Sequence, residues 1–280
     1  MKVIFFSEGQ TIGKVPRDFK NARTEYAWSI ALDAEWCPIN TEPRTNDFDL
    51  GIVIIPKNNP EVDISYFKKY CNKVAVMQEG PHWYFQDYSI EQQFKYFNSL
   101  MDADWVYCHN ESDVEYYLGL GVEDVRVMRS LMITDGLHPR SEWGDATMIG
   151  GNFVSWYGGF DSYVVAREIG HSISAPSMGR KQEQEDAIED IQYLAYMSWR
   201  EWITCLSQYN IGVHLMRTHA AGTFAMNCSF HGIPCIGYKG LDTQEILHPL
   251  TTVDVGNLDE AKKIAYKLKN DEKFYNLCSE

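Results

Sequence analysis

The chain lacks the cysteine patterns that mark disulfide frameworks and small metal sites. Its seven cysteines stand singly along the 280 residues, mostly inside apolar segments, and none forms a CxxC pair. An odd number of isolated cysteines argues against a closed disulfide framework, and no His/Cys spacing typical of a metal site is present. We therefore expect a reducing, cytoplasmic setting and no bound metal.

Long apolar runs and an excess of basic residues are also missing. No stretch approaches the roughly 20 apolar residues of a membrane helix, and the apolar run near the N-terminus is too short for a signal peptide. The formal net charge is −14, with 14 basic and 21 acidic residues in positions 1–140 and 11 and 18 in the rest. We expect no integral membrane segment and no broad basic face for nucleic acid; a local basic cleft and peripheral membrane contact stay open.

Several nucleotide and hydrolase motifs are absent as well. There is no G-x-G-x-x-G, Walker A or nucleophile-elbow sequence, which argues against nicotinamide, ATP and α/β-hydrolase chemistry. What the chain does contain is a regular alternation of apolar strand-length runs with helix-length segments. This alternation predicts a doubly wound α/β fold, and the length favours about two domains.

The stretch 209–239 organises the second half of the chain. It predicts a buried strand at 211–216, a turn of small residues at 218–222, a helix at 223–230 and a second strand at 234–238. Small side chains in the turn let a ligand approach the backbone, and free amides at a helix start attract anions. Close packing of the helix on the strand explains the same small residues, so the turn alone leaves both interpretations open.

Two loops in the first half are further candidates for binding. The first apolar strand, 2–7, is followed by a polar loop containing Gly13 and Lys14, which we expect at the carboxyl edge of the sheet, and then by a helix at 23–36. The strand at 73–77 opens onto the aromatic stretch 78–88, in which His82 is a candidate polar contact. A hydrophobic plug is the alternative for those aromatic residues.

Two segments resemble a known family. The sequence HAAGTFAMNCSFHGIPCI, from His219 to Ile236, is similar to the donor-binding segment of retaining GT-B glycosyltransferases, and ADWVYCHNESDVEYYLGLGVEDVRVM, from Ala103 to Met128, to the end of their first domain. The resemblance implies two Rossmann-like domains facing a central cleft, at residues 1–135 and 146–280. The stretch between them reads as a linker.

The resemblance also assigns roles. It implies a metal-independent enzyme without a cofactor, using a nucleotide-sugar co-substrate, with UDP as the expected nucleotide. His219 would lie near the sugar, Asn227 near the ribose and His82 towards the acceptor, so we take His82 and His219 as catalytic candidates. The donor-binding candidates are Gly13, Lys14, Asn152, Tyr196, Met197, Arg217, Ala221, Gly222, Thr223 and Asn227.

The sequence departs from the family pattern at charged positions. His219 and Asn227 replace two glutamates, and Asn152 stands where the family has an arginine that neutralises the diphosphate; the corresponding lysine is also missing. A diphosphate needs compensating charge, since a helix N-terminus supplies only about half a positive charge. Arg217 is the favoured substitute because it precedes the small-residue turn, with Lys14 and the pair Arg180 and Lys181 as alternatives.

The predicted function is transfer of a hexose or pentose from a nucleotide sugar to an acceptor hydroxyl. The acceptor is a glycan, or a hydroxymethylated DNA base as in bacteriophage DNA modification. If the enzyme inverts, the general base is His82, Glu79 or His109. A catalytically silent nucleotide-sugar-binding module and a sugar-nucleotide epimerase are the alternatives. The family's closing helix is not recognisable before Glu280, which leaves a shortened chain and a compact variant open, and oligomeric state is not indicated.

Overall fold

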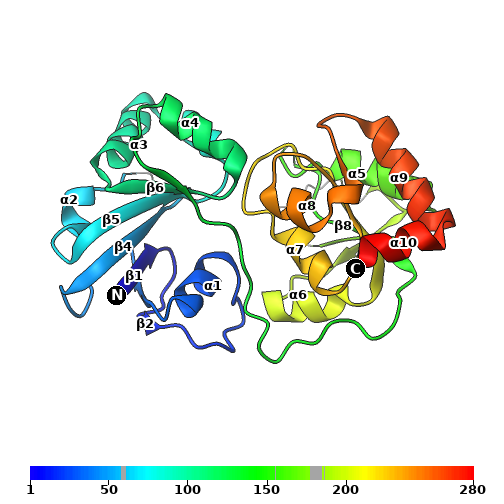
Figure 1. Ribbon diagram of the computed structural model, residues 1–280, viewed down its shortest axis with the longest axis horizontal. Helices are drawn as coiled ribbons and strands as arrows, with labels where there is room; N and C mark the ends of the chain where they lie inside the picture. Colours follow the sequence, from blue (N-terminus) through cyan, green and yellow to red (C-terminus); the bar gives the residue numbers. More distant parts are fainter. Residues whose placement is uncertain (58–60, 155, 177–184, 186) are drawn as a thin grey trace. The chain divides into compact units, whose positions relative to one another are not determined.

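A computed structural model describes residues 1–57, 61–154, 156–176, 185 and 187–280. The chain forms two compact units. The first comprises Met1–Ile133 together with His219–Ala221, and the second comprises Thr134–Thr218 and Gly222–Glu280. Each unit is a sheet with its own helices (Figure 1). The α/β architecture predicted from the alternating pattern is confirmed, and the chain forms two largely parallel sheets.

The first unit is built on a seven-stranded sheet in the order β2-β3-β1-β4-β5-β6-β7, parallel except for the edge pair β2 and β3. Its long inner strand β4 is buried at seven of eight positions, as expected for a strand covered on both faces. The strands are β1 (Val3–Ser7), β2 (Gly13–Lys14), β3 (Glu35–Pro38), β4 (Phe48–Ile55), β5 (Cys71–Gln78), β6 (Trp105–Cys108) and β7 (Val125–Val127).

Helices on both faces complete this unit. One face packs against three helices through residues such as Phe67, Tyr96 and Tyr117, whereas Trp28 of α1 is buried elsewhere in the unit. The longest helix, α3, begins with a reciprocal capping box between Ser89 and Gln92, which satisfies two backbone amides. The helices are α1 (Thr24–Ala31), α2 (Ile64–Phe67), α3 (Ile90–Asp102) and α4 (Val114–Gly119), with 3₁₀ turns η1 (His82–Asp87) and η2 (Glu111–Asp113).

The second unit has a six-stranded, fully parallel sheet in the order β10-β9-β8-β11-β12-β13. Numbered from its own first strand this is 3-2-1-4-5-6, the order of dinucleotide-binding sheets. The strands are β8 (Ala146–Ile149), β9 (Ile173–Pro176), β10 (Ile191–Leu194), β11 (Tyr209–His214), β12 (Cys235–Tyr238) and β13 (Thr252–Val253).

Neighbouring residues of β8 point into different cores of this unit. Ile149 packs with α5 and α9, whereas Met148 packs with α6 and α7, so helices cover both faces (Figure 1). The helices are α5 (Gly159–Ile169), α6 (Trp199–Leu206), α7 (Thr223–Phe230), α8 (Asp242–Leu247), α9 (Leu258–Asn270) and α10 (Glu272–Ser279), with the 3₁₀ turn η4 (Pro249–Thr251). Among the described residues, no helix has the length and apolar character needed to cross a membrane.

The helix predicted after the first polar loop was wrong in extent. The helix expected over 23–36 ends at Ala31, because Asp33 takes a positive φ of 51° and Trp36 enters β3, where its ring stacks on Tyr26 at 4.2 Å. Glu245 and Ile246 lie in α8, and the last strand of the sheet is β13. In the acidic segment 182–190, residues 182–184 and 186 fall outside the described residues.

The stretch read as a linker clusters with the second unit through Arg140. Its guanidinium donates to the carbonyls of Tyr209 (3.0 Å) and Gly232 (2.6 Å) and to the hydroxyl of Tyr275 (3.1 Å). Its Cζ also lies 4.7 Å from the ring centre of Trp143. The backbone amide of Arg140 also donates to His231 Nδ1 (3.1 Å). One side chain thus fastens an irregular segment to a strand end, a turn and the last helix.

Replacing Arg140 tests this anchor. We expect Arg140→Met to lower the free energy of unfolding by about 2 kcal/mol or more, because two half-buried carbonyls lose a charged donor. Urea unfolding followed by circular dichroism measures the change. Arg167→Met is the matched control in the same unit. Arg167 is largely exposed, pairs with Asp190 at 3.8 Å and lies 5.7 Å from the ring centre of Tyr163, and we expect its replacement to cost less than about 0.5 kcal/mol. Equal losses in the two variants would contradict the anchoring role.

Candidate functional site

The second sheet has a switch point between β8 and β11. Connections leave these two neighbouring strands in opposite directions across the sheet, since β9 and β10 lie on one side and β12 and β13 on the other. Ligands of open α/β sheets bind outside the carboxyl ends of the strands at such a point. The residues found there are those that follow Ile149 in β8 and His214 in β11, together with the starts of α5 and α7.

Both helices at the switch point begin after a glycine in the left-handed conformation. Gly158 has φ 64° and Gly222 has φ 63°, and neither α5 nor α7 has a side-chain cap on its first amides. A Cβ at Gly158 would collide with the carbonyl of Leu215, and one at Gly222 with the hydroxyl of Thr243, which donates to the Gly222 carbonyl at 2.7 Å. With the present neighbours both positions need glycine, and both helix starts leave amides available to an anion.

Asn152 supplies a polar group at the same edge. It is 1% exposed, its Oδ1 accepts from the amide of Val154 (3.3 Å), and its Nδ2 has no hydrogen-bond partner among the described residues. A buried amide donor without a partner costs free energy unless a ligand or water accepts from it. Its position after β8 is the one at which the family resemblance has an arginine.

Arg217 is already part of an ion pair. Its Nη2 lies 3.1 Å from Asp161 Oδ2 in the first turn of α5, and the hydroxyl of Tyr238 donates to the same oxygen at 3.0 Å. Burial, followed by the hydrogen bond to Asp161, raises the pKa of Tyr238 to about 12, so it remains protonated near neutrality. Arg217 is largely exposed, and its remaining N–H groups are still available to a phosphate, although Asp161 offsets part of the charge.

The other predicted donor-binding residues differ in exposure and in the unit to which they belong. Tyr196 is 76% exposed and Met197 half-buried after β10, whereas Asn227 is buried in α7, where its Oδ1 accepts from Trp199 Nε1 at 3.5 Å. Thr223 is the first residue of α7, and Ala221 clusters with the first unit. Arg180 and Lys181 lie outside the described residues.

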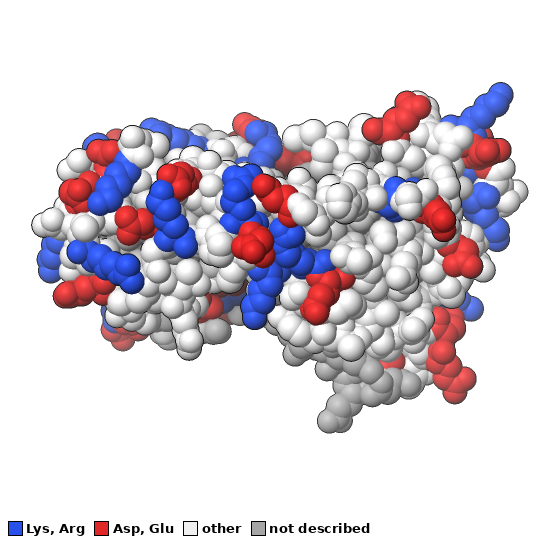
Figure 2. Space-filling view, turned by 90° about the horizontal axis from the view of Figure 1, so that it is seen from below, with Lys and Arg blue, Asp and Glu red and all other residues white. Residues whose placement is uncertain are grey.

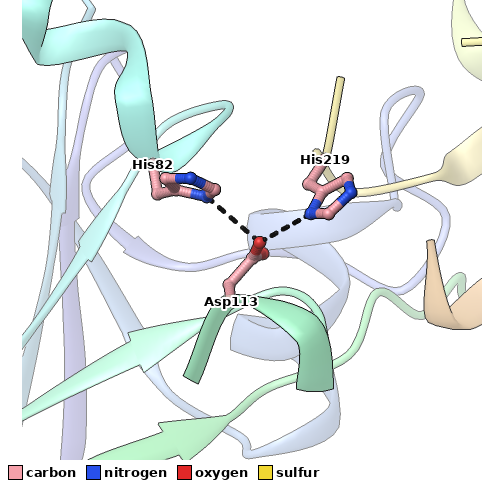
Figure 3. A group of neighbouring side chains, drawn as sticks. All are labelled: His82, Asp113 and His219. Atoms are coloured by element: carbon pink, nitrogen blue, oxygen red, sulfur yellow. Dashed lines mark hydrogen bonds and ion pairs between the residues drawn. The ribbon is translucent and has the colours of Figure 1, made fainter. Parts of the chain in front are cut away.

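A cluster of three side chains forms the second candidate site, within the first unit. Nδ1 of His82 lies 3.1 Å from Asp113 Oδ1, and Nδ1 of His219 lies 3.0 Å from the same oxygen (Figure 3). His82 opens η1 after β5, and Asp113 ends η2 after β6. The fold thus brings together both histidines predicted from the sequence and adds a carboxylate between them.

Asp113 is held by further donors. Its side chain is 5% exposed, and its second oxygen accepts from Asn110 Nδ2 at 3.1 Å. Burial alone would raise the pKa of this carboxyl, but hydrogen bonds from His219, His82 and Asn110 hold the pKa well below its ordinary value. Asn110 also donates to the carbonyl of Ala220 at 3.0 Å, and Ser112 Oγ lies 3.2 Å from His219 Nδ1. Asp113 is therefore an anion that orients two imidazoles.

The shared carboxylate fixes which ring nitrogens are reactive. If Asp113 accepts an N–H from Nδ1 of each ring, the neutral imidazoles keep Nε2 as an acceptor, as in Asp-His pairs of hydrolases. The sequence analysis did not predict Asp113 and Asn110 as site residues. An acidic residue at a helix start that follows a buried strand could have indicated Asp113. Asp113 precedes α4 yet makes no cap bond, because its carboxylate is turned to the histidines.

The remaining candidates are less suited to catalysis. Lys14 in β2 pairs with Glu35, the first residue of β3, and its Nζ lies 2.5 Å from Asp33 Oδ2. Gly13 and Lys14 therefore lie at the amino edge of the sheet. Their predicted position at the carboxyl edge was wrong. Glu79 lies 3.7 Å from Lys57. Burial lowers the pKa of His109 to about 4, which makes His109 a weak base at neutral pH.

Buried His214 makes the stability of the second unit depend on pH. Burial lowers its pKa to about 4, and its ring lies against Phe224 at 5.3 Å. An unfolded histidine titrates near 6.5, so unfolding takes up a proton between these values; stability is complete above about pH 6.5 and falls as the pH decreases towards 4.

We expect His214→Asn to reduce this dependence. Between pH 7 and pH 5 the wild-type free energy of unfolding should fall by about 2 kcal/mol more than that of the variant. Urea unfolding at both pH values measures the difference. His138→Asn, at an exposed position of the same unit, is the control. An unchanged pH dependence in His214→Asn would refute the buried neutral state.

Comparison with solved structures identifies the fold. UDP-bound HepE of Anabaena aligns over 100% of this chain and 93% of its own, with TM-score 0.65 and 11% identity. Sucrose-phosphate synthase of Thermosynechococcus elongatus aligns over 100% and 92%, with TM-score 0.65 and 10% identity. A TarM mutant of S. aureus in complex with UDP gives TM-score 0.61 at 10% identity over 82% of this chain; the chain spans 50% of that protein.

These similarities establish the fold at a level that sequence comparison does not reach. No protein-family model matches the chain, and no curated protein matches it. The two parallel sheets and the structural matches together show a GT-B fold.

Proposed function

We propose that the chain transfers a hexose from a UDP-sugar to an acceptor hydroxyl. The main support is the switch point of the second sheet, where two uncapped helices and the unpartnered amide of Asn152 meet. The GT-B structures it resembles include HepE with UDP-glucose. In this proposal the sugar is bound as the nucleotide diphosphate ester, and the diphosphate occupies the helix starts of the second unit.

Charge compensation is the first requirement of this reaction. The departing diphosphate gains negative charge, which the first amides of α5 and α7, Asn152 Nδ2 and the exposed N–H groups of Arg217 stabilise. Tyr238 is protonated and adds a hydroxyl beside Asp161. In this proposal these groups compensate the charge of the diphosphate without a metal ion.

Proton removal from the acceptor is the second requirement. The bond between the anomeric carbon and the phosphate oxygen breaks, a bond from that carbon to the acceptor oxygen forms, and the hydroxyl proton passes to a base. His82 is the candidate base, with Nε2 as the proton acceptor and Asp113 holding Nδ1–H. His219, held by the same carboxylate, hydrogen-bonds the transferred sugar.

A small hydroxyl acceptor such as a glycan fits the surface charge better than duplex DNA. The chain carries a formal charge of −14, and Figure 2 shows Lys and Arg side chains mixed with Asp and Glu on the face in view. Several basic side chains are paired with acids, as in Lys2 with Asp47 and Lys95 with Glu61. DNA-binding surfaces instead need unpaired basic residues along the phosphates. The glycan is therefore the preferred acceptor.

A glycine substitution tests the donor site. We expect Gly222→Ala to weaken UDP-glucose binding at least tenfold, because a Cβ displaces Thr243 and the start of α7. Isothermal titration of UDP-glucose measures the affinity. Gly256→Ala is the matched control, since Gly256 also has a positive φ, of 84°, but no described atom lies within 4 Å of an added Cβ. Equal affinities in both variants would contradict a diphosphate site at α7.

Donor binding and UDP release test the proposed transfer reaction directly. A panel of nucleotide sugars screened by thermal shift identifies the donor, since a ligand that binds only the folded chain raises the melting temperature. Slow release of UDP from that donor, accelerated by an acceptor, supports a transferase. Binding without turnover would instead indicate a silent binding module, and a changed sugar without an acceptor would indicate an epimerase.

Substitution of the histidines separates binding from catalysis. We expect His82→Ala to lower kcat for transfer by about 10²- to 10⁴-fold with an unchanged affinity for UDP, because the base is lost while the phosphate site is intact. Assays of UDP release in the presence of acceptor, quenched at successive times, measure kcat. His138→Ala serves as the control histidine. An unaffected kcat in His82→Ala would exclude His82 as the base.

A further inference from the structure

Three ligating atoms in the first unit converge on one point. His82, His219 and Asp113 each offer one ligand atom, and these three atoms lie within 4.8 Å of one another (Figure 3). We propose that these three side chains form a binding site for a divalent transition-metal ion, with Zn²⁺ as the favoured ion, and that occupancy inhibits the proposed sugar transfer. The inhibitory part rests on the proposed function, whereas the binding site does not.

The distances fit a metal as well as they fit hydrogen bonds. Zinc binds imidazole nitrogen at about 2.0–2.1 Å and carboxylate oxygen at about 2.0–2.2 Å, so adjacent ligand atoms of a tetrahedral site lie roughly 3.3 Å apart. Asp113 Oδ1 lies 3.1 Å from the His82 nitrogen and 3.0 Å from the His219 nitrogen. The ligand atoms of the two histidines lie within 4.8 Å of each other, so the imidazole side chains have to rotate to hold the ion at this spacing.

The surroundings resemble the outer shell of a metal site. Ligating carboxylates are usually held by hydrogen bonds to their second oxygen, and here Asn110 Nδ2 donates to Asp113 Oδ2 at 3.1 Å. Asn110 also donates to the carbonyl of Ala220, the residue after His219. Two of the three ligands are thus oriented by the same amide.

Ligand chemistry and access select the kind of ion. Two imidazoles and one carboxylate suit zinc and its transition-metal neighbours, whereas magnesium and calcium prefer oxygen ligands. The side chains of His82 and His219 are 19% and 29% exposed, and the Asp113 side chain beneath them is 5% exposed. An ion can therefore reach the nitrogens from solvent. Three protein ligands leave a fourth position for water or a substrate hydroxyl.

Occupancy changes the tautomers that the transfer step needs. A neutral imidazole that binds a metal through Nδ1 carries its proton on Nε2, so the proton moves from Nδ1 to Nε2 when the ion replaces the hydrogen bond to Asp113. Nε2 of His82 then donates rather than accepts, and it no longer removes a proton from the acceptor. The expected consequence is reversible inhibition by zinc and full activity of chelator-treated protein.

The binding test uses the full chain after removal of metals by a chelator. Calorimetric titration with Zn²⁺ should show one ion per chain, and Co²⁺ should give the visible absorption bands of a four-coordinate site. We expect His219→Ala and Asp113→Ala each to lower the affinity about 100-fold, and Asn110→Ala about tenfold. His138→Ala, at an exposed histidine of the second unit, should bind like the wild type. Circular dichroism and the affinity for UDP, which lacks the sugar that His219 is proposed to contact, check that each variant is folded.

Each outcome bears on one proposal. Absence of stoichiometric zinc binding, or binding that survives His219→Ala and Asp113→Ala in folded protein, would overturn the metal site and leave the transferase proposal intact. Zinc binding by a chain that never transfers sugar would overturn the transferase proposal and leave the site. Zinc binding without inhibition of an active enzyme would overturn only the inhibitory role.

Discussion

The buried carboxylate of Asp113 is the constraint on which the first-unit site depends. An ionised carboxylate with 5% of its side chain exposed is unstable unless donors surround it, and His82, His219 and Asn110 provide them. The same donors fix the orientation of both imidazoles. Stability and chemistry therefore share one set of contacts, so removing any donor would affect both the local fold and the reactive nitrogens.

The second unit faces a different electrostatic problem. Under the proposed function it has to attract a dianionic group although Arg217 is paired with Asp161. Its means are backbone amides, exposed at α5 and α7 by glycines that have no side chain to cover them. Partial charges held in fixed positions cost little reorganisation when negative charge develops, which explains how a chain without the usual arginine and lysine can still favour a diphosphate.

Much of the fold could be predicted from sequence, because apolar periodicity is local. The run 49–56 is apolar and strand-length, and it forms β4; the unit 209–239 forms β11, α7 and β12 as expected. His82 and His219 were predicted for the site, and they do lie together. Gly222 was predicted because a glycine before a helix has a local meaning.

What could not be predicted depends on contacts distant in the chain. Asp113 gains its role only when residues 31 and 106 positions away approach it, and the charge pattern around it resembles an ordinary helix start. Trp36 appeared helical because its neighbours favour a helix, whereas stacking on Tyr26 places it in β3. Lys14 was expected near a phosphate, but strand pairing with Glu35 determines its position.

Gly158 and Gly222 differ in what prevents their replacement by a larger residue. At Gly158 an added Cβ meets the backbone carbonyl of Leu215, which no change of neighbouring side chain can remove. At Gly222 the obstacle is the side-chain hydroxyl of Thr243, so a second mutation of Thr243 to alanine would remove the atom that an added Cβ meets. The effect of replacing Gly222 therefore depends on the residue at position 243, whereas the effect of replacing Gly158 does not.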